Sequence, residues 1–129
     1  MSDSTASPTL LWEPSAERIA QANLTQFIAR VNARWNAGAR DHASVYEWSI
    51  REPERFWESV WDYAGVVGDK GAAPYLVDGD RMPGARWFPA ARLNFAENLL
   101  QRRDAETAMV FWGEDKVRRQ LSFGELYDL

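Results

Sequence analysis

Apolar residues between positions 24 and 35 recur every three or four residues, the spacing of one face of a helix. Ser15 is placed to begin a shorter helical stretch before it. Asn23, followed three residues later by Gln26, resembles a capping box that would start the second helix. Gly38 lies where that helix is predicted to end. The residues of the apolar stripe are Leu24, Phe27, Ile28, Val31 and Trp35.

Residues 53–64 show a sharper separation of apolar from polar positions. Ser44 and Glu47 form a capping box that predicts a short helix, and Pro53 suits the first turn of the next one. Placed at about 100° per residue, one side of that next helix is apolar. It carries Phe56, Trp57, Val60, Trp61, Tyr63 and Ala64. The other side carries Glu54, Arg55, Glu58, Ser59 and Asp62. We expect the aromatic side to be a core or interface packing surface rather than a ligand site.

The composition of the chain changes over residues 64–89, which hold five glycines and three prolines. Only residues 75–77 suggest a strand. Loops longer than about 12–15 residues are uncommon inside compact domains, so this segment is predicted to be a connector lying over a larger body. Its glycines match the spacing of neither a dinucleotide fingerprint nor a phosphate-binding loop.

The last third of the chain predicts a helix, a hairpin and another helix. Asn94 with Glu97 is a capping-box variant, and residues 107–112 read as a strand that returns over residues 117–121 after a turn. Ser122 with Glu125 caps a final helix. The fold class is therefore predicted to be mainly α with a small β-hairpin. A helix of about two turns and a lone hairpin are marginal by themselves, which suggests the N-terminal piece of a larger protein.

Composition narrows the classes of function. The net charge is −4, so no general attraction to nucleic acid is expected, and without cysteine there are no disulfides or thiolate sites. No apolar run approaches the roughly 20 residues that span a membrane. Residues 1–9 read as a flexible tail without the features of a secretory signal, so we expect a cytoplasmic protein.

The chemistry of a catalytic site is not evident in the sequence. The single histidine, His42, follows Asp41 in a polar segment, and an enzyme using His42 is only a weak third alternative. No cluster of histidine and carboxylate residues has the spacing of metal ligands. We assign no catalytic, cofactor-binding or metal-binding residue.

Four segments carry a family resemblance: LWEPSAERIAQANLTQFIARVNARW, YEWSIREPERFWESVWDYAGV, RWFPAARLNFAENLL and VFWGEDKVRRQLSFGELYDL. In this order and spacing they resemble the N-terminal region of the acetoacetyl-CoA synthetases, which are adenylate-forming acyl-CoA synthetases. The resemblance implies that the whole enzyme joins acetoacetate to CoA through an acyl-adenylate, using ATP and Mg²⁺. It also implies that this region binds none of these cofactors and is inactive alone.

The resemblance further implies a division of the chain. Residues 10–106 would form a helical cap that includes the 64–89 connector, and residues 107–129 would begin the AMP-binding domain. Trp57, Trp61, Trp87 and Phe88 would dock the cap onto the remainder of the enzyme, its expected partner. One alternative is a stand-alone helical interaction module that binds a partner through the Trp57/Trp61 face. Another is the N-terminal region of an acetyl-CoA or other short-chain acyl-CoA synthetase.

Overall fold

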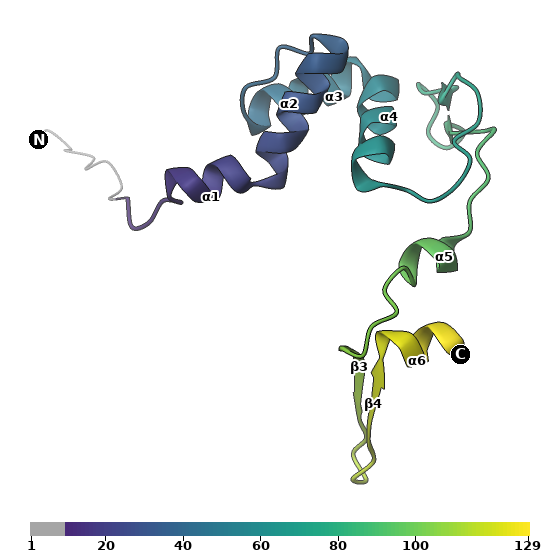
Figure 1. Cartoon of the computed structure of the whole chain (residues 1–129). Coiled ribbons are helices and arrows are strands. Elements are labelled where there is room, and N and C mark those ends of the chain that lie inside the picture. Colours follow the sequence, from purple (N-terminus) through teal and green to yellow (C-terminus); the bar gives the residue numbers. More distant parts are fainter. Residues whose placement is uncertain (1–9) are drawn as a thin grey trace, which may run out of the picture. The chain divides into compact units, whose positions relative to one another are not determined.

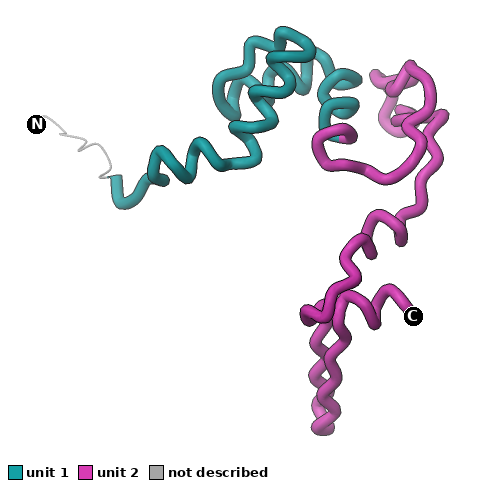
Figure 2. Tube along the Cα trace, viewed as in Figure 1, with its two compact units in different colours: residues 1–60 teal, residues 61–129 magenta. Residues whose placement is uncertain are grey.

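The computed structural model describes residues 10–129, so the predicted tail at residues 1–9 lies outside the described part (Figure 1). The helices are α1 (Ala16–Gln21), α2 (Asn23–Trp35), α3 (His42–Arg51), α4 (Pro53–Ala64), α5 (Phe95–Leu99) and α6 (Phe123–Asp128). The strands are β1 (Leu76–Val77), β2 (Arg86–Trp87), β3 (Thr107–Trp112) and β4 (Arg118–Ser122). Two compact units divide at Val60 and Trp61, within α4 (Figure 2).

The start of α1 is confirmed, whereas the start of α2 differs from the prediction. The Ser15 hydroxyl accepts from the Arg18 backbone N–H at 3.2 Å. Ala22, not Asn23, is the N-cap of α2, and it makes no side-chain capping bond. Because Ala22 both closes α1 and opens α2 with extended backbone, Asn23 is already the first helical residue. The Gln26 side chain does reach back, but to the carbonyl of Gln21 at 3.4 Å.

Helix α2 ends at Trp35, three residues before Gly38. Asn36 takes the left-handed conformation there, with φ of 50°, and its N–H donates to the Asn32 carbonyl at 2.9 Å. Asparagine tolerates this conformation better than most residues, which is why a helix can end on it. The Asn32 side chain then exchanges two hydrogen bonds with the backbone of Ala39, at 2.7 and 2.9 Å. These bonds fix the turn that leads into α3.

The N-terminal cap of α3 also lies earlier than predicted. Asp41 is the N-cap, and its carboxylate accepts from the Ser44 backbone N–H at 2.8 Å. The Ser44 hydroxyl accepts in return from the Asp41 N–H at 3.0 Å. Ser44 is thus the third helical residue of a capping box rather than its first member. Aspartate and serine are about equally good N-caps, and with Asp41 in this role the helix is three residues longer than predicted.

The core of the first unit is built from α2, α3 and α4. Its buried apolar residues are Phe27, Val31, Ala39, Val45 and Trp48. The Phe56 ring meets Phe27 and Trp48 edge to face, with centroid distances of 5.9 and 6.0 Å. This arrangement suits the charge distribution of aromatic rings. The apolar stripe of α2 therefore does face a core, as the sequence predicts.

Two residues on the polar side of α4 are buried rather than exposed to solvent. Glu58 and Ser59 are both buried. Glu58 forms an ion pair with Arg34, and the Ser59 hydroxyl accepts from the Trp35 indole N–H at 2.9 Å. Because α2 presents polar partners to this side, the polar residues can be buried without losing their hydrogen bonds. Helical periodicity alone cannot reveal a buried polar contact of this kind.

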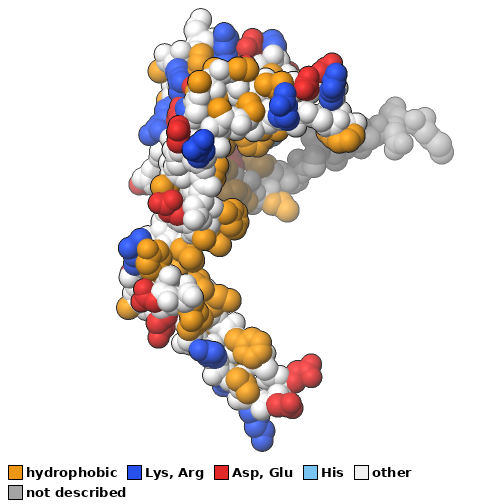
Figure 3. Space-filling view, turned by 90° about the vertical axis from the view of Figure 1, so that its right-hand side faces the viewer, with side chains coloured by type: hydrophobic (Ala, Val, Ile, Leu, Met, Phe, Trp, Pro, Cys, Tyr) orange, Lys and Arg blue, Asp and Glu red, His pale blue; other side chains and the backbone are white. Residues whose placement is uncertain are grey.

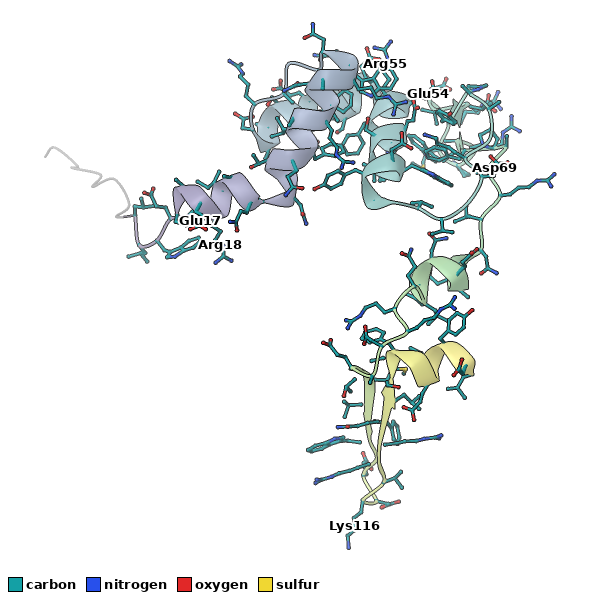
Figure 4. The ribbon with its side chains drawn as sticks, viewed as in Figure 1. Glu17, Arg18, Glu54, Arg55, Asp69 and Lys116 are labelled. Carbon is teal, nitrogen blue, oxygen red and sulfur yellow. The ribbon has the colours of Figure 1, made fainter. Side chains whose placement is uncertain are left out.

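In the second unit, the glycine-rich connector forms a small hairpin of its own. The predicted strand at residues 75–77 is confirmed as β1, which pairs antiparallel with β2. The prediction missed β2, because two residues are too few to show alternation. Asp69 and Arg92 exchange two backbone hydrogen bonds of 2.8 Å, and they join the two ends of this segment (Asp69 is labelled in Figure 4).

Asn98, on α5, anchors the beginning of the connector. Its side-chain oxygen accepts from the Val67 N–H, and its amide nitrogen donates to the Val67 carbonyl, both at 2.8 Å. The same nitrogen also donates to the Asn94 carbonyl at 2.9 Å. One side chain thus mimics a strand partner for a residue 31 positions away.

The predicted elements of the last third are confirmed with small shifts. Asn94 caps α5 by accepting from the Glu97 N–H at 3.2 Å. Strand β3 has the predicted bounds, and β4 begins one residue later than predicted, because the Val117 carbonyl closes the turn with the Gly113 N–H at 2.8 Å. Ser122 and Glu125 form the predicted capping box of α6. The fold class is confirmed as mainly α, with two small antiparallel hairpins rather than one.

Candidate functional site

Asp41, whose neighbour His42 suggested acid–base chemistry, has a structural role at the start of α3. The Asp41 carboxylate is engaged by Ser44 through both its backbone N–H and its hydroxyl. Hydrogen bonds that favour the charged form lower a carboxyl pKa. The pKa of Asp41 accordingly lies below its ordinary value of 3.8, with the Ser44 backbone N–H as the largest cause.

We expect the cap to make the stability of α3 sensitive to acid. Because the pKa of Asp41 is lowered on folding, its stabilisation is fully present above the ordinary value of 3.8 and is lost as the pH falls through the folded value. Asp41→Asn keeps a capping oxygen without a titrating group. The variant should therefore lose less stability than the parent as the pH falls below 3.8, as hydrogen exchange of the α3 amides would show. Identical pH profiles for the two proteins would contradict this role.

Residues 10–129 contain no group of three or more histidine or carboxylate side chains that could hold a metal ion. Within the same residues, no helix has the length and apolarity needed to cross a membrane. The features that remain for a functional surface are aromatic.

Three of the aromatic side chains in the second unit form a contiguous cluster of Trp61, Tyr75 and Phe88. The Phe88 ring lies 5.0 Å from Trp61 and 5.2 Å from Tyr75, measured between centroids, with both pairs tilted. The cluster therefore joins α4 to the residues that directly precede β1 and follow β2. Trp61 and Phe88 were both predicted to belong to a docking surface, and the structure brings them together.

A lysine side chain lies at one end of this cluster. Lys70 donates to the Asp62 carboxylate at 2.6 Å, and its ammonium lies 5.4 Å from the centroid of the Tyr75 ring. A cation over an aromatic face is attracted by the negative charge density of the ring. Sequence reasoning missed Lys70 and Tyr75 as members of this arrangement, since neither belongs to a periodic pattern.

Phe88 also has an unusual backbone conformation. Its φ is +44°, in the left-handed region that bulky residues rarely adopt. The Phe88 N–H donates to the Tyr75 carbonyl at 2.8 Å, which ties this conformation to the connector hairpin. The ring is thereby directed into the cluster, and Trp87, the residue before it, is left at the surface.

The other two residues of the predicted docking surface are more exposed. Trp87 on β2 is 42% exposed, and its Cα pairs with that of Leu76. Trp57 lies in the first unit, where it is 45% exposed and meets the Phe56 ring at 5.4 Å between centroids. Large aromatic surfaces left accessible are typical of interaction sites. Each of the two units thus presents one accessible tryptophan of the predicted set.

Comparison with known proteins gives the relationships of the chain. Residues 42–99 match the family described as the acetyl-coenzyme A synthetase N-terminus. An acetoacetyl-coenzyme A synthetase from Rhizobium meliloti is 42% identical over 116 residues, which cover 90% of this chain and 18% of that protein. A malonamoyl-CoA synthetase from Penicillium aethiopicum is 35% identical over 92 residues, covering 70% of this chain and 12% of its own length.

A solved structure is similar in both sequence and fold. The acetoacetyl-CoA synthetase from Streptomyces lividans superposes with a TM-score of 0.74 and 36% identity. The match covers 92% of this chain and 19% of that one. This chain therefore spans less than a fifth of the length of these synthetases.

Proposed function

This chain is a homologue of the N-terminal region of the acetoacetyl-CoA synthetases, and from that premise we propose that it is part of an acetoacetate–CoA ligase. The whole enzyme would convert ATP, acetoacetate and CoA into acetoacetyl-CoA, AMP and pyrophosphate through an acyl-adenylate. The observation that carries the proposal is the agreement of sequence and fold with the same class of synthetase over nine-tenths of the chain.

The residues described here would not perform the chemistry themselves. We place the ATP, Mg²⁺ and CoA sites in the remainder of the enzyme, since this chain spans only 18% of the Rhizobium relative. We propose a cytoplasmic location, as expected for an enzyme that consumes ATP and CoA. The role left to this chain is structural: it would cover and anchor the catalytic part.

A domain boundary near residue 106 fits this role. Residues 10–106 would form the cap, and residues 107–129 would open the AMP-binding domain. The family match ends at residue 99, before β3 begins, which supports a boundary between α5 and β3.

The cap would dock through Trp57, Trp61, Trp87 and Phe88. Trp61 and Phe88 form part of the aromatic cluster and would give the surface a rigid base. Trp57 and Trp87 would supply the accessible area that becomes buried on the partner. Burying a large apolar side chain contributes about 1.5–3 kcal/mol. Burial of the exposed parts of these two tryptophans would therefore stabilise the docked cap measurably.

Replacing Trp57 and Trp61 together with alanine should lower the melting temperature of the full-length enzyme. It should also reduce activity, because the cap would no longer hold its position. The matched control is Tyr46→Ala, which removes an aromatic residue of the first unit that is exposed and outside the surface. Melting and activity equal to those of the control would remove the support for docking through these tryptophans.

The activity itself is tested by ATP–pyrophosphate exchange with the full-length protein. Exchange that depends on acetoacetate is expected. Acetate and malonamate are the informative competitors, since the family description and one relative name other acyl groups. Faster exchange with either competitor would reassign the substrate, and no exchange with any short acid would overturn the ligase function.

A further inference from the structure

A pocket of about 560 Å³ lies in the second unit, where it is lined by residues of α5, of α6 and of the segment that follows α5. This volume is within the range of about 300–1,000 Å³ that is usual for small-molecule sites. Part of the lining is apolar and includes Leu100. Four of the polar lining residues are Glu97, Gln101, Arg103 and Tyr127. An apolar lining with a few polar groups is the usual composition of a ligand site.

Contacts outside the lining hold α6 against the segment that follows α5. The Phe123 N–H donates to the Glu106 carbonyl, and the Gly124 N–H donates to the Asp104 carbonyl, both at 3.0 Å. The guanidinium carbon of Arg102 lies 4.1 Å from the centroid of the Phe123 ring. The two walls of the pocket are therefore fixed by the chain itself, so a ligand would not have to bring them together.

Polar side chains next to the pocket are already bonded within the chain. Arg102 donates to the carboxylate of Asp104 at 2.9 Å and to that of Glu106 at 2.6 Å. The Asn98 side chain makes two hydrogen bonds with the backbone of Val67, both at 2.8 Å. These groups hold the local structure and have little capacity left for a ligand.

The polar side chains that line the pocket differ in this respect. In the part of the chain that the structure describes, the Glu97 carboxylate, the Gln101 amide and the Tyr127 hydroxyl form no hydrogen bond. Arg103 forms no ion pair there, and its guanidinium carbon lies 3.7 Å from the centroid of the Tyr127 ring. A guanidinium stacked on a ring keeps its N–H groups available to a planar anion. Unused hydrogen-bonding groups are thus gathered at this pocket.

Two of these groups carry opposite charges. Glu97 and Arg103 line the same pocket and form no ion pair with each other. A ligand with only a carboxylate would be attracted by Arg103 and repelled by Glu97, and the reverse holds for a simple amine. A ligand with both groups would satisfy both residues. Figure 3 likewise shows side chains of both charges among hydrophobic ones in its lower part.

We propose that this pocket binds a small zwitterion, an amino acid with an apolar side chain. The ligand carboxylate accepts hydrogen bonds from Arg103 and from the Tyr127 hydroxyl. The ligand ammonium donates to Glu97, and the apolar side chain lies against Leu100. The proposal goes beyond the ligase function and does not depend on it, because the binding requires neither ATP nor CoA.

Equilibrium dialysis of the full-length protein against radiolabelled leucine, without ATP or CoA, measures this binding. Two analogues isolate the charges, since isocaproate lacks the ammonium and isopentylamine lacks the carboxylate. Each should compete for the leucine site roughly tenfold less well than unlabelled leucine, because a hydrogen bond to a charged group contributes about that much. Absence of leucine binding would overturn the proposal. Equal competition by either analogue would overturn the assignment of a zwitterion.

Substitutions locate the binding within the protein. Arg103→Gln and Glu97→Gln should each weaken leucine binding roughly tenfold or more, for the same reason. The matched controls are Arg81→Gln and Glu114→Gln, which remove the same charges from exposed positions outside the pocket. Both controls should bind leucine as the parent does. Unchanged binding by Arg103→Gln and Glu97→Gln, or equal losses in the controls, would overturn the assignment of the site.

The outcome for this site is separable from the outcome for the ligase. Leucine binding that Arg103→Gln abolishes, in a protein without acetoacetate-dependent exchange, would remove the ligase function and leave the site standing. Full ligase activity without leucine binding would do the reverse.

Discussion

Trp48→Ala should destabilise the α2–α4 unit by about 3–5 kcal/mol, the range measured when large aromatic residues are removed from a core. Trp48 is only 2% exposed, and its ring meets Phe56 edge to face, which in turn meets Phe27. The substitution removes the largest side chain of this core and leaves a cavity between α3 and α4. The unit has few other buried apolar residues, so the loss is a large fraction of its stability.

The measurement is the exchange of the slowest α2 and α3 amides in the full-length protein, which reports the opening of this unit alone. Tyr46→Ala is the matched control in the same helix. Tyr46 is 60% exposed, and its removal should change the free energy of opening by no more than about 0.5 kcal/mol. Similar effects of the two substitutions would show that Trp48 is not a core residue.

Gly71→Ala should destabilise the connector by about 2–4 kcal/mol, because a strained backbone and a steric clash act together. Gly71 has φ of +74°, and an added Cβ would lie 2.7 Å from the carbonyl carbon and oxygen of Ala90. Those atoms belong to backbone, which cannot rotate away as a flexible side chain can. To relieve the clash, the backbone around Gly71 would have to move away from Ala90. This movement would disturb the Asp69–Arg92 bridge, which lies two residues away on each strand of the contact.

Gly65→Ala separates the two contributions. Gly65 has a similar φ of +65°, but no atom lies within 4 Å of its added Cβ. Its replacement should cost only the roughly 1–2 kcal/mol of the left-handed conformation. Exchange of the Asp69 and Arg92 amides would report both variants. If Gly71→Ala were no worse than Gly65→Ala, the close approach at Ala90 would not hold in solution.

Elements with a strong local signal were predictable from the sequence. The Ser122 and Glu125 pair satisfies backbone groups within one turn, so a local sequence pattern is enough to indicate it, and the structure confirms it. The run of strand-favouring residues in β3 was likewise located to the residue. The cap of α3 was misplaced because Asp41 and Ser44 compete for one role. The cap of α2 was misplaced because Ala22, which closes α1, also opens α2 without a side-chain bond.

The candidate site was predictable only in part. Aromatic residues at helical spacing identified Trp57 and Trp61, and the family resemblance added Trp87 and Phe88. The sequence could not show that Trp61 and Phe88 share a cluster with Tyr75, because their contact joins residues far apart along the chain. Docking through these residues remains a prediction.

The sequence by itself determined which stretches are helical, where β3 runs and which family the chain resembles, because those properties depend on short-range spacing and on residue identity. Only the tertiary structure decided which side chains are buried. Glu58 and Ser59 lie inside although their helix positions indicate solvent, because Arg34 and Trp35 arrive from α2 with matching hydrogen-bonding groups. Burial of a polar group depends on the partner it meets, and that partner comes from a distant part of the chain.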